Sequence, residues 1–303
     1  MEKEQKIRLL SQLGLLLVAI IWGWGFMATR LAVDDGLSAS FIMMGRFIIA
    51  AAVFGIAFGK QIRAAITLEM VRGGVLVGVF LFLGFMVQTL AMERTTPSNA
   101  AFLTATNVVM VPFLWWAAAH RRPPVKMVAA CVVCLVGIGL LSFQPGEGLS
   151  LHGGDLLALL CAFFFACQIV LTGILAARMD AKVLVFLQFV TAAVLSAIAF
   201  FILDGSLSSF RPSMGLAAVG YLGVFSTCLC YLLQTLGQQH VPASKAALIL
   251  CMESLFGSLF SVMMGYDRLT GSLVAGGLVI MGSVVLSEAN LPLKRKKAEK
   301  QKL

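Results

Sequence analysis

The sequence predicts an all-α integral membrane protein with ten transmembrane helices, arranged as two inverted five-helix repeats. Three observations lead to this fold class. The chain is very apolar, with 60% hydrophobic and only 12% charged residues. Its apolar residues fall into ten runs of about the length that crosses a bilayer. A short sequence pattern also recurs, at a constant spacing, in the second half of the chain.

The composition excludes a water-soluble globule. A soluble domain is about 45–50% apolar and about 25% charged, whereas this chain has a mean hydropathy of +0.96. The net charge of +9 is concentrated after the last apolar run. The basic residues there are Lys294, Arg295, Lys296, Lys297, Lys300 and Lys302. This pattern is typical of a cytoplasmic tail near anionic lipid headgroups, so it argues against nucleic acid as a partner.

The apolar runs are bounded by charged residues or by Pro and Gly clusters. They predict helices at 12–33, 39–58, 70–91, 99–119, 125–143, 154–177, 182–203, 214–236, 243–265 and 270–290. The connecting segments are short, so successive helices are expected to run antiparallel.

Lysine and arginine indicate the orientation. With a cytoplasmic N-terminus, the inner segments and tail hold 18 of the 23 basic residues, and the outer loops hold only Arg94, Arg211 and Arg268. Arg30 and Arg46 fall within spans. This asymmetry follows the positive-inside rule. It predicts a multi-pass protein of the cell inner (plasma) membrane with both termini in the cytoplasm.

An internal repeat divides the chain. Gln88-Thr89-Leu90, followed after seven residues by Ser98-Asn99-Ala100-Ala101, recurs 146 residues later as Gln234-Thr235-Leu236 and Ser244-Lys245-Ala246-Ala247. The predicted units are 1–143, 144–290 and the basic tail 291–303. Because each unit has five helices, an odd number, the second must enter the membrane from the opposite side. Inverted repeats are an architecture of secondary transporters; a duplicated scaffold without transport is the alternative.

Several motifs occur in a specific order. They are Trp22-Gly23-Trp24-Gly25-Phe26, Arg46-Phe47 with Ala50, Ser98 to Thr104 with Val111-Pro112, Ala246-Ala247-Leu248 to Glu253, and Asp267-Arg268-Leu269-Thr270. Across essentially its whole length the chain resembles the drug/metabolite transporter superfamily, EamA type. The resemblance implies ten helices and export of amino acids, nucleosides, drugs or related metabolites. Glu253-Ser254 departs from the family's Glu-Pro pair, which puts a proline kink there in doubt.

Two ionisable residues lie deep inside predicted helices. Placing such a residue at a helix centre costs about 2.5–3.5 kcal/mol on insertion scales, so it is a functional candidate. Glu253 lies near the middle of helix 243–265, and Arg46 lies about 10 Å below the outer end of helix 39–58. They form either a substrate or proton site or a structural ion pair between the two halves.

Polar and aromatic residues supply further candidates for lining a cavity. Thr104, Asn107, Gln168 and Tyr231 are expected to line it, although interhelical hydrogen bonds explain each of them equally well. Gln88 and Gln234 lie near opposite ends of symmetric helices and are gate candidates. Trp22 and Trp24 lie at mid-depth, where an indole can stack on a substrate or fill the core. Because they point about 200° apart, at most one is expected to face the cavity.

No pattern in the sequence indicates an enzyme. The chain has no Gly-Lys-Ser/Thr nucleotide loop, and its histidines, His120, His152 and His240, lie in loops. No cofactor and no metal site are expected. The sequence predicts a secondary transporter of small metabolites, an exporter by alternating access, with protons as the candidate coupling ion. The alternatives are a membrane-embedded lipid-modifying enzyme and a non-transporting scaffold.

Overall fold

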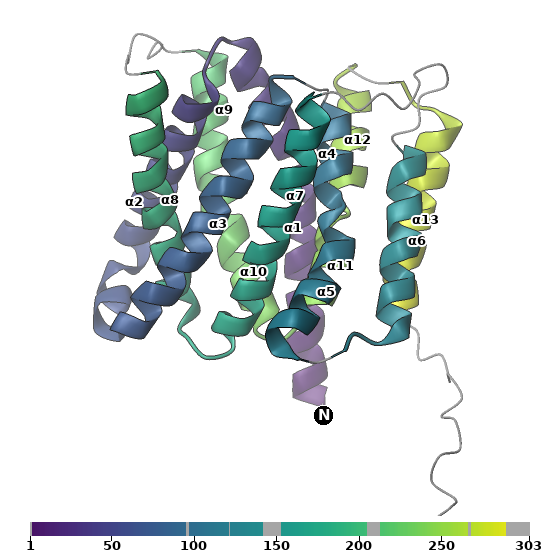
Figure 1. Ribbon diagram of the computed structural model, residues 1–303, viewed down its shortest axis with the longest axis horizontal. Coiled ribbons are helices and arrows are strands. Elements are labelled where there is room, and N and C mark those ends of the chain that lie inside the picture. The colour runs from purple at the N-terminus through teal and green to yellow at the C-terminus, as the bar shows by residue number, and fades with distance from the viewer. Residues whose placement is uncertain are drawn as a thin grey trace, which may run out of the picture.

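The computed structural model describes residues 2–94, 97–120, 122–141, 153–204, 213–265 and 268–288. These residues form helices and short connections, with no strand among them. The helices lie side by side in one bundle (Figure 1). The prediction of an all-helical membrane protein is therefore confirmed. The basic tail 291–303 and Arg121 lie outside the described residues.

Among its described residues, the first half of the chain contributes six helical segments. They are α1 (Glu2–Asp34), α2 (Ala39–Ala65), α3 (Leu68–Met92), α4 (Pro97–Ala105), α5 (Asn107–Ala119) and α6 (Val125–Leu141). Among its described residues, the second half contributes seven α-helices and one π-helix. They are α7 (Gly153–Ala176), α8 (Ala181–Leu203), α9 (Met214–Tyr221), the π-helix η2 (Leu222–Leu229), α10 (Cys230–Gln238), α11 (Ala243–Leu250), α12 (Glu253–Met263) and α13 (Gly271–Glu288).

Polar caps start the second helix of each half at matching places. Ser38 Oγ accepts a hydrogen bond from the Phe41 amide at the start of α2. Asp180 does the same for the amides of Lys182 and Val183 at the start of α8. Each cap satisfies backbone donors that have no partner inside the helix.

The two halves run in opposite directions. In Figure 1, α1 rises from the N-terminus at the lower end of the bundle, whereas α7 descends from the upper end. Contacts at both ends agree with this arrangement. Ser38 and Ser40, where α2 begins, donate to Asp204, which follows α8 at the upper end. Lys182 Nζ, where α8 begins, donates to Gln61 Oε1 near the lower end of α2 at 2.6 Å.

Eight helical segments of the described chain are long and apolar enough to cross a membrane, whereas the sequence predicted ten. They are Lys3–Asp34, Ala39–Ala65, Leu68–Met92, Ala100–Ala119, Gly153–Ala176, Ala181–Leu203, Met214–Gln238 and Ala243–Met263. The last helix of each half is apolar but shorter, Val125–Leu140 and Gly271–Ser287. These two helices, α6 and α13, lie together at one side of the bundle (Figure 1).

Two helices expected to be regular are interrupted. Helix 99–119 breaks at Thr106, where α4 ends, and helix 243–265 breaks at Cys251 and Met252. Neither break contains a proline. Thr106 Oγ1 instead donates to the Leu103 carbonyl at 2.6 Å, and Cys251 Sγ donates to the Leu248 carbonyl at 2.9 Å. Side chains that bond locally to the backbone compete with the helix and bend it.

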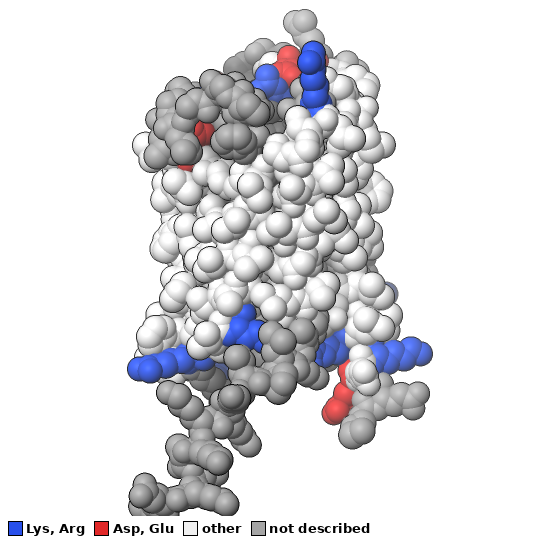
Figure 2. Space-filling view, turned by 90° about the vertical axis from the view of Figure 1, so that its right-hand side faces the viewer, with Lys and Arg blue, Asp and Glu red and all other residues white. Residues whose placement is uncertain are grey.

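On the face of the molecule drawn in Figure 2, charged side chains lie only at the two ends. Figure 2 shows a wide uncharged band between them, with lysine and arginine side chains along the lower end. Exposed leucine, isoleucine and phenylalanine side chains are frequent in the helices of this band. An apolar belt between charged ends is the surface expected of a protein that lies across a bilayer.

Candidate functional site

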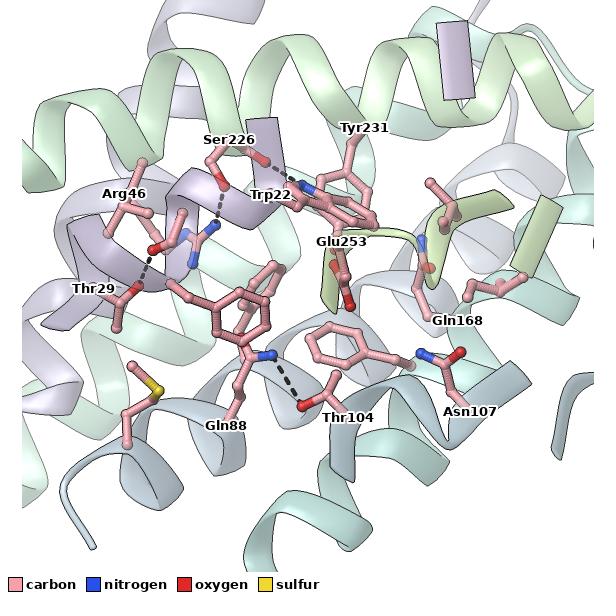
Figure 3. A pocket seen from close by; sticks show the side chains of 18 residues that line it. Trp22, Thr29, Arg46, Gln88, Thr104, Asn107, Gln168, Ser226, Tyr231 and Glu253 are labelled. Atoms are coloured by element: carbon pink, nitrogen blue, oxygen red, sulfur yellow. Dashed lines mark hydrogen bonds between the residues drawn. The ribbon is translucent and has the colours of Figure 1, made fainter. Parts of the chain in front are cut away.

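One cavity lies between the two halves of the chain. It is lined by residues of both halves. The polar and aromatic residues labelled in Figure 3 are Trp22, Thr29, Arg46, Gln88, Thr104, Asn107, Gln168, Ser226, Tyr231 and Glu253. Apolar and aromatic walls with a few convergent polar groups are typical of a small-molecule site.

Arg46 supplies a positive charge to this cavity. Its side chain is 2% exposed. Its Nε donates to Thr227 Oγ1 at 3.0 Å, and its Nη2 donates to Ser226 Oγ at 3.4 Å. The guanidinium carbon lies 3.9 Å from the centroid of the Phe85 ring, within the range of a cation–π interaction. Within the described chain these neutral groups hold the guanidinium, and no carboxylate pairs with it.

Glu253 supplies a negative charge to the same cavity. It is the first residue of α12 and is 7% exposed. Among the described residues its carboxylate accepts no hydrogen bond and forms no ion pair, with Arg46 or with any other cation. The ion pair considered from the sequence is therefore absent. Arg46 instead bonds to the hydroxyls of the π-helix, because η2 places Ser226 and Thr227 beside it.

Trp22 is held by the same π-helix. Its Nε1 donates to the Ser226 carbonyl at 2.8 Å, and its ring lies 5.3 Å from the Tyr231 ring. A π-helix widens the backbone turn and is frequent at functional sites. Leu222, Ser226 and Tyr231 all face the cavity from this stretch of chain. The irregular backbone thus forms one wall of the cavity.

The cavity lies where the two repeats meet. With the 146-residue spacing of the sequence repeat, Asn107 corresponds to Glu253 and Phe85 to Tyr231. All four residues line the cavity. Thr104 and its counterpart Leu250 line it as well. Equivalent positions can meet in one cavity only if it lies close to the axis that relates the repeats.

The structure brings together most of the residues singled out from the sequence. Trp22, Arg46, Gln88, Thr104, Asn107, Gln168, Tyr231 and Glu253 all line the cavity. Trp24 does not belong to the described lining; its ring lies edge-on to Phe260 at 5.4 Å, because it points away from Trp22 around the helix. Gln234 is also outside the lining, and its Nε2 donates to Gln168 Oε1 and Gln238 Oε1, both at 3.2 Å.

Several lining residues were missed by the sequence reasoning. Phe85 could have been found, because it is the repeat counterpart of Tyr231. Ser226 and Phe165 gave no comparable signal. Ser226 matters through its hydroxyl and also through its backbone carbonyl, and only the π-helix directs that carbonyl to Trp22.

Similarity to known proteins decides the family. The family model described as the EamA-like transporter family matches residues 9–143 and again residues 152–288. The chain belongs to this family. The resemblance inferred from the motifs is thereby confirmed, as is an architecture of two EamA repeats.

Relatives of this EamA-like chain agree with the assignment. An uncharacterized transporter of Archaeoglobus fulgidus is 30% identical over 279 residues, covering 92% of this chain and 86% of its own length. The uncharacterized transporter YwfM of Bacillus subtilis is 30% identical over 188 residues, covering 61% of this chain and 62% of its own. A solved crystal structure matches with a TM-score of 0.74 at 18% identity, covering 91% of this chain and 96% of that one.

The chain is therefore a multi-pass membrane protein of a transporter family. Membership implies a small-molecule substrate and a lipid bilayer as surroundings. The relatives are named as transporters, not as enzymes.

Proposed function

We propose that this EamA-like protein is a secondary transporter of small metabolites that works by alternating access of two inverted repeats, 1–143 and 144–290. In this proposal ten helices cross the membrane, with α6 and α13 as the two shorter ones. One observation carries the proposal: repeat-equivalent residues, Asn107 with Glu253 and Phe85 with Tyr231, line one cavity between the halves. A site on the axis between repeats can open to either side by rocking one repeat against the other.

The charges of the cavity indicate which solutes it favours. Within the part of the chain that the structure describes, no carboxylate pairs with the Arg46 guanidinium and no cation pairs with the Glu253 carboxylate. Buried charges are stable when they are paired. A solute with one anionic and one cationic group satisfies both residues at once. Among the metabolite classes of the family, amphoteric solutes such as amino acids therefore fit best, with Trp22 and Phe165 against their apolar parts.

Glu253 is the proposed site of proton coupling. A carboxylate at this depth has to bind a cation or take up a proton. The proposed cycle alternates the two, so that substrate and proton compete for one carboxylate. Such competition couples an inward proton gradient to outward movement of the solute, which makes the protein an exporter.

The proposed location is the plasma membrane, with both termini in the cytoplasm. The lysine and arginine residues near the lower end of the bundle support this orientation (Figure 2). Asp35 at the upper end and Lys60 at the lower end are both exposed. In intact cells, an impermeant thiol reagent should label D35C from outside and K60C only after the cells are opened. The opposite pattern would reverse the orientation.

Uptake into proteoliposomes tests the function. The panel contains solutes that are amphoteric, only anionic, only cationic or neutral, each with and without a pH gradient. At least one amphoteric solute should enter the proteoliposomes faster than it enters liposomes without protein. A pH gradient should raise the rate of this uptake further. A non-transporting scaffold would move none of them, and a lipid-modifying enzyme would instead change the composition of the liposomes.

A further inference from the structure

Four buried glutamines form a continuous chain of side-chain hydrogen bonds between helices α7, α8 and α10. Gln168 Nε2 donates to Gln188 Oε1, Gln234 Nε2 donates to Gln168 Oε1, and Gln234 Nε2 also donates to Gln238 Oε1, each at 3.2 Å. All four side chains are at most 5% exposed. We call Gln168, Gln188, Gln234 and Gln238 the glutamine ladder.

The glutamine ladder extends from the cavity toward the lower end of the bundle. Gln168 lines the cavity. Gln238 is the last residue of α10, and its Nε2 donates to the Ile169 carbonyl at 2.8 Å. The next residue, Gln239, donates to the carbonyl of Ala176, which ends α7 at the lower end. The ladder therefore occupies the region between the cavity and the lower end of the bundle, where α1 begins.

The residues of the first repeat that correspond to the glutamine ladder do not form such a chain of hydrogen bonds among the described residues. Gln88 and Met92 correspond to Gln234 and Gln238 at the 146-residue spacing. Arg46 corresponds to Gln188, because each lies eight residues after the N-cap of its helix. Gln88, Met92 and Arg46 all line the cavity. Met92 is the last residue of α3, so on this side the cavity reaches toward the upper end.

The ladder residues are hydrogen-bonded to one another in the second repeat, whereas their counterparts in the first repeat line the cavity. In a protein of two inverted repeats, such a difference indicates that one side of the cavity is closed and the other is more open. A transporter of this kind closes one side of its site while the other is open, and the two repeats exchange arrangements during the cycle. We infer that the glutamine ladder is the gate that closes the cavity toward the lower end of the bundle, and that separation of its glutamines is the step that opens the cavity there. The inference rests on the proposed alternating access.

The chemistry of the ladder suits a gate that must open repeatedly. Amide groups are neutral, so separating them does not leave an unpaired charge buried in the bilayer. Gln188 Nε2 and Gln234 Oε1 are buried without a hydrogen-bond partner among the described residues. Unsatisfied amide atoms weaken the closed arrangement, and water entering from the lower end would satisfy them. The closed and open forms are therefore expected to be close in free energy.

Thiol accessibility tests the gate without requiring a known substrate. The reporter N107C lies in the cavity, and an impermeant thiol reagent is applied from either side in right-side-out and inside-out vesicles. The chain without the reporter gives the background from its seven native cysteines. Gln188→Leu removes one ladder bond and should raise the labelling rate from the lower side about fivefold, the effect of one neutral hydrogen bond. Labelling from the upper side should not rise.

A neighbouring position on the same helix provides the matched control. Thr191 Oγ1 donates only within α8, to the Leu187 carbonyl at 2.8 Å. Thr191→Val removes that hydroxyl without changing the ladder, so its labelling should match that of the reporter protein. Gln238→Leu is the second test variant, because it lies at a helix end where a loss of folding is less expected. It should shift labelling in the same direction as Gln188→Leu.

The outcomes separate the gate from the proposed function. The gate would be overturned if folded Gln188→Leu and Gln238→Leu were labelled from the lower side at the rate of the reporter protein. It would also be overturned if Thr191→Val changed that rate as much as they do. Either result would count against the gate even if the protein transports normally. Conversely, a shift in Gln188→Leu and Gln238→Leu supports the gate even if no solute of the panel is moved, a result that would count against the proposed function alone.

Discussion

Asn107 and Glu253 occupy the same position in the two repeats, and both line the one cavity between them. Each is the first residue of the second segment of an interrupted helix, α5 in one repeat and α12 in the other. At this position the two repeats thus share a break in the helix but differ in charge, with an amide in one and a carboxylate in the other. Glu253 is therefore the acidic residue among the described residues that line the cavity. The proposed proton coupling depends on it for that reason.

Glu253→Gln is expected to separate proton coupling from solute exchange. The substitution keeps the shape of the side chain but removes its charge, so it can neither take up a proton nor pair with the cationic group of the solute. Uptake driven by a pH gradient should fall to below about a tenth of the original rate, whereas exchange at saturating solute should be retained with a raised KM. Proteoliposome uptake and exchange measure the two rates. Glu93→Gln is the control, because Glu93 lies outside the cavity and accepts only from the Ala39 amide; a pH response of Glu253→Gln equal to this control would refute the coupling.

Trp22→Phe and Trp24→Phe should differ. The first loses the 2.8 Å bond to the Ser226 carbonyl of the π-helix and leaves that buried acceptor without its partner. It should lower the free energy of unfolding by about 1 kcal/mol and raise KM several-fold. The second keeps an aromatic ring against Phe260 and should behave like the unmodified protein. Thermal unfolding in detergent and transport kinetics measure both effects, and equal losses in the two variants would place Trp22 in the core.

Gly23→Ala should destabilise the contact between α1 and α12. A Cβ atom at Gly23 would lie 2.7 Å from Phe256 Cβ and 2.8 Å from the Gly257 amide nitrogen. Because backbone cannot move aside cheaply, the expected loss is about 1–3 kcal/mol. Gly14, on the same helix, has nothing within 4 Å of a Cβ atom, so Gly14→Ala should be neutral or slightly stabilising. Melting temperatures compare the two; equal values would mean that the close approach is not required.

The apolar runs and the repeat predicted the fold because both depend on local composition and spacing. Hydropathy shows where a segment leaves water, and the Gln88 and Gln234 motifs show that the two halves are copies. Glu253 and Arg46 were found by the cost of placing a charge in the bilayer. Whether they share a substrate site or form an ion pair stayed open in the sequence, and the structure places both in one cavity without an ion pair between them.

Other features depended on tertiary structure. The breaks at Thr106 and at Cys251 contain no proline, so the sequence showed only continuous apolar runs there. The π-helix η2 has a counterpart in α3 that is a regular helix of similar composition. Without η2, nothing indicated that Arg46 would bond to Thr227 instead of pairing with Glu253. Gln168 and Gln234 were singled out from the sequence, but their hydrogen bonds to Gln188 and Gln238 were not, because the four residues come from three helices.

The most direct test of the central claim is solute counterflow with Arg46→Gln. Arg46 is proposed to bind the anionic group of the substrate, and a hydrogen bond to a charged group is worth about 1.5–3 kcal/mol. KM for an amphoteric solute should therefore rise roughly 10- to 100-fold. Arg30→Gln, which removes a partly exposed arginine paired with Asp34 at 2.9 Å, should leave KM unchanged. An unchanged KM in folded Arg46→Gln, or no counterflow by the unmodified protein, would contradict a substrate site in this cavity.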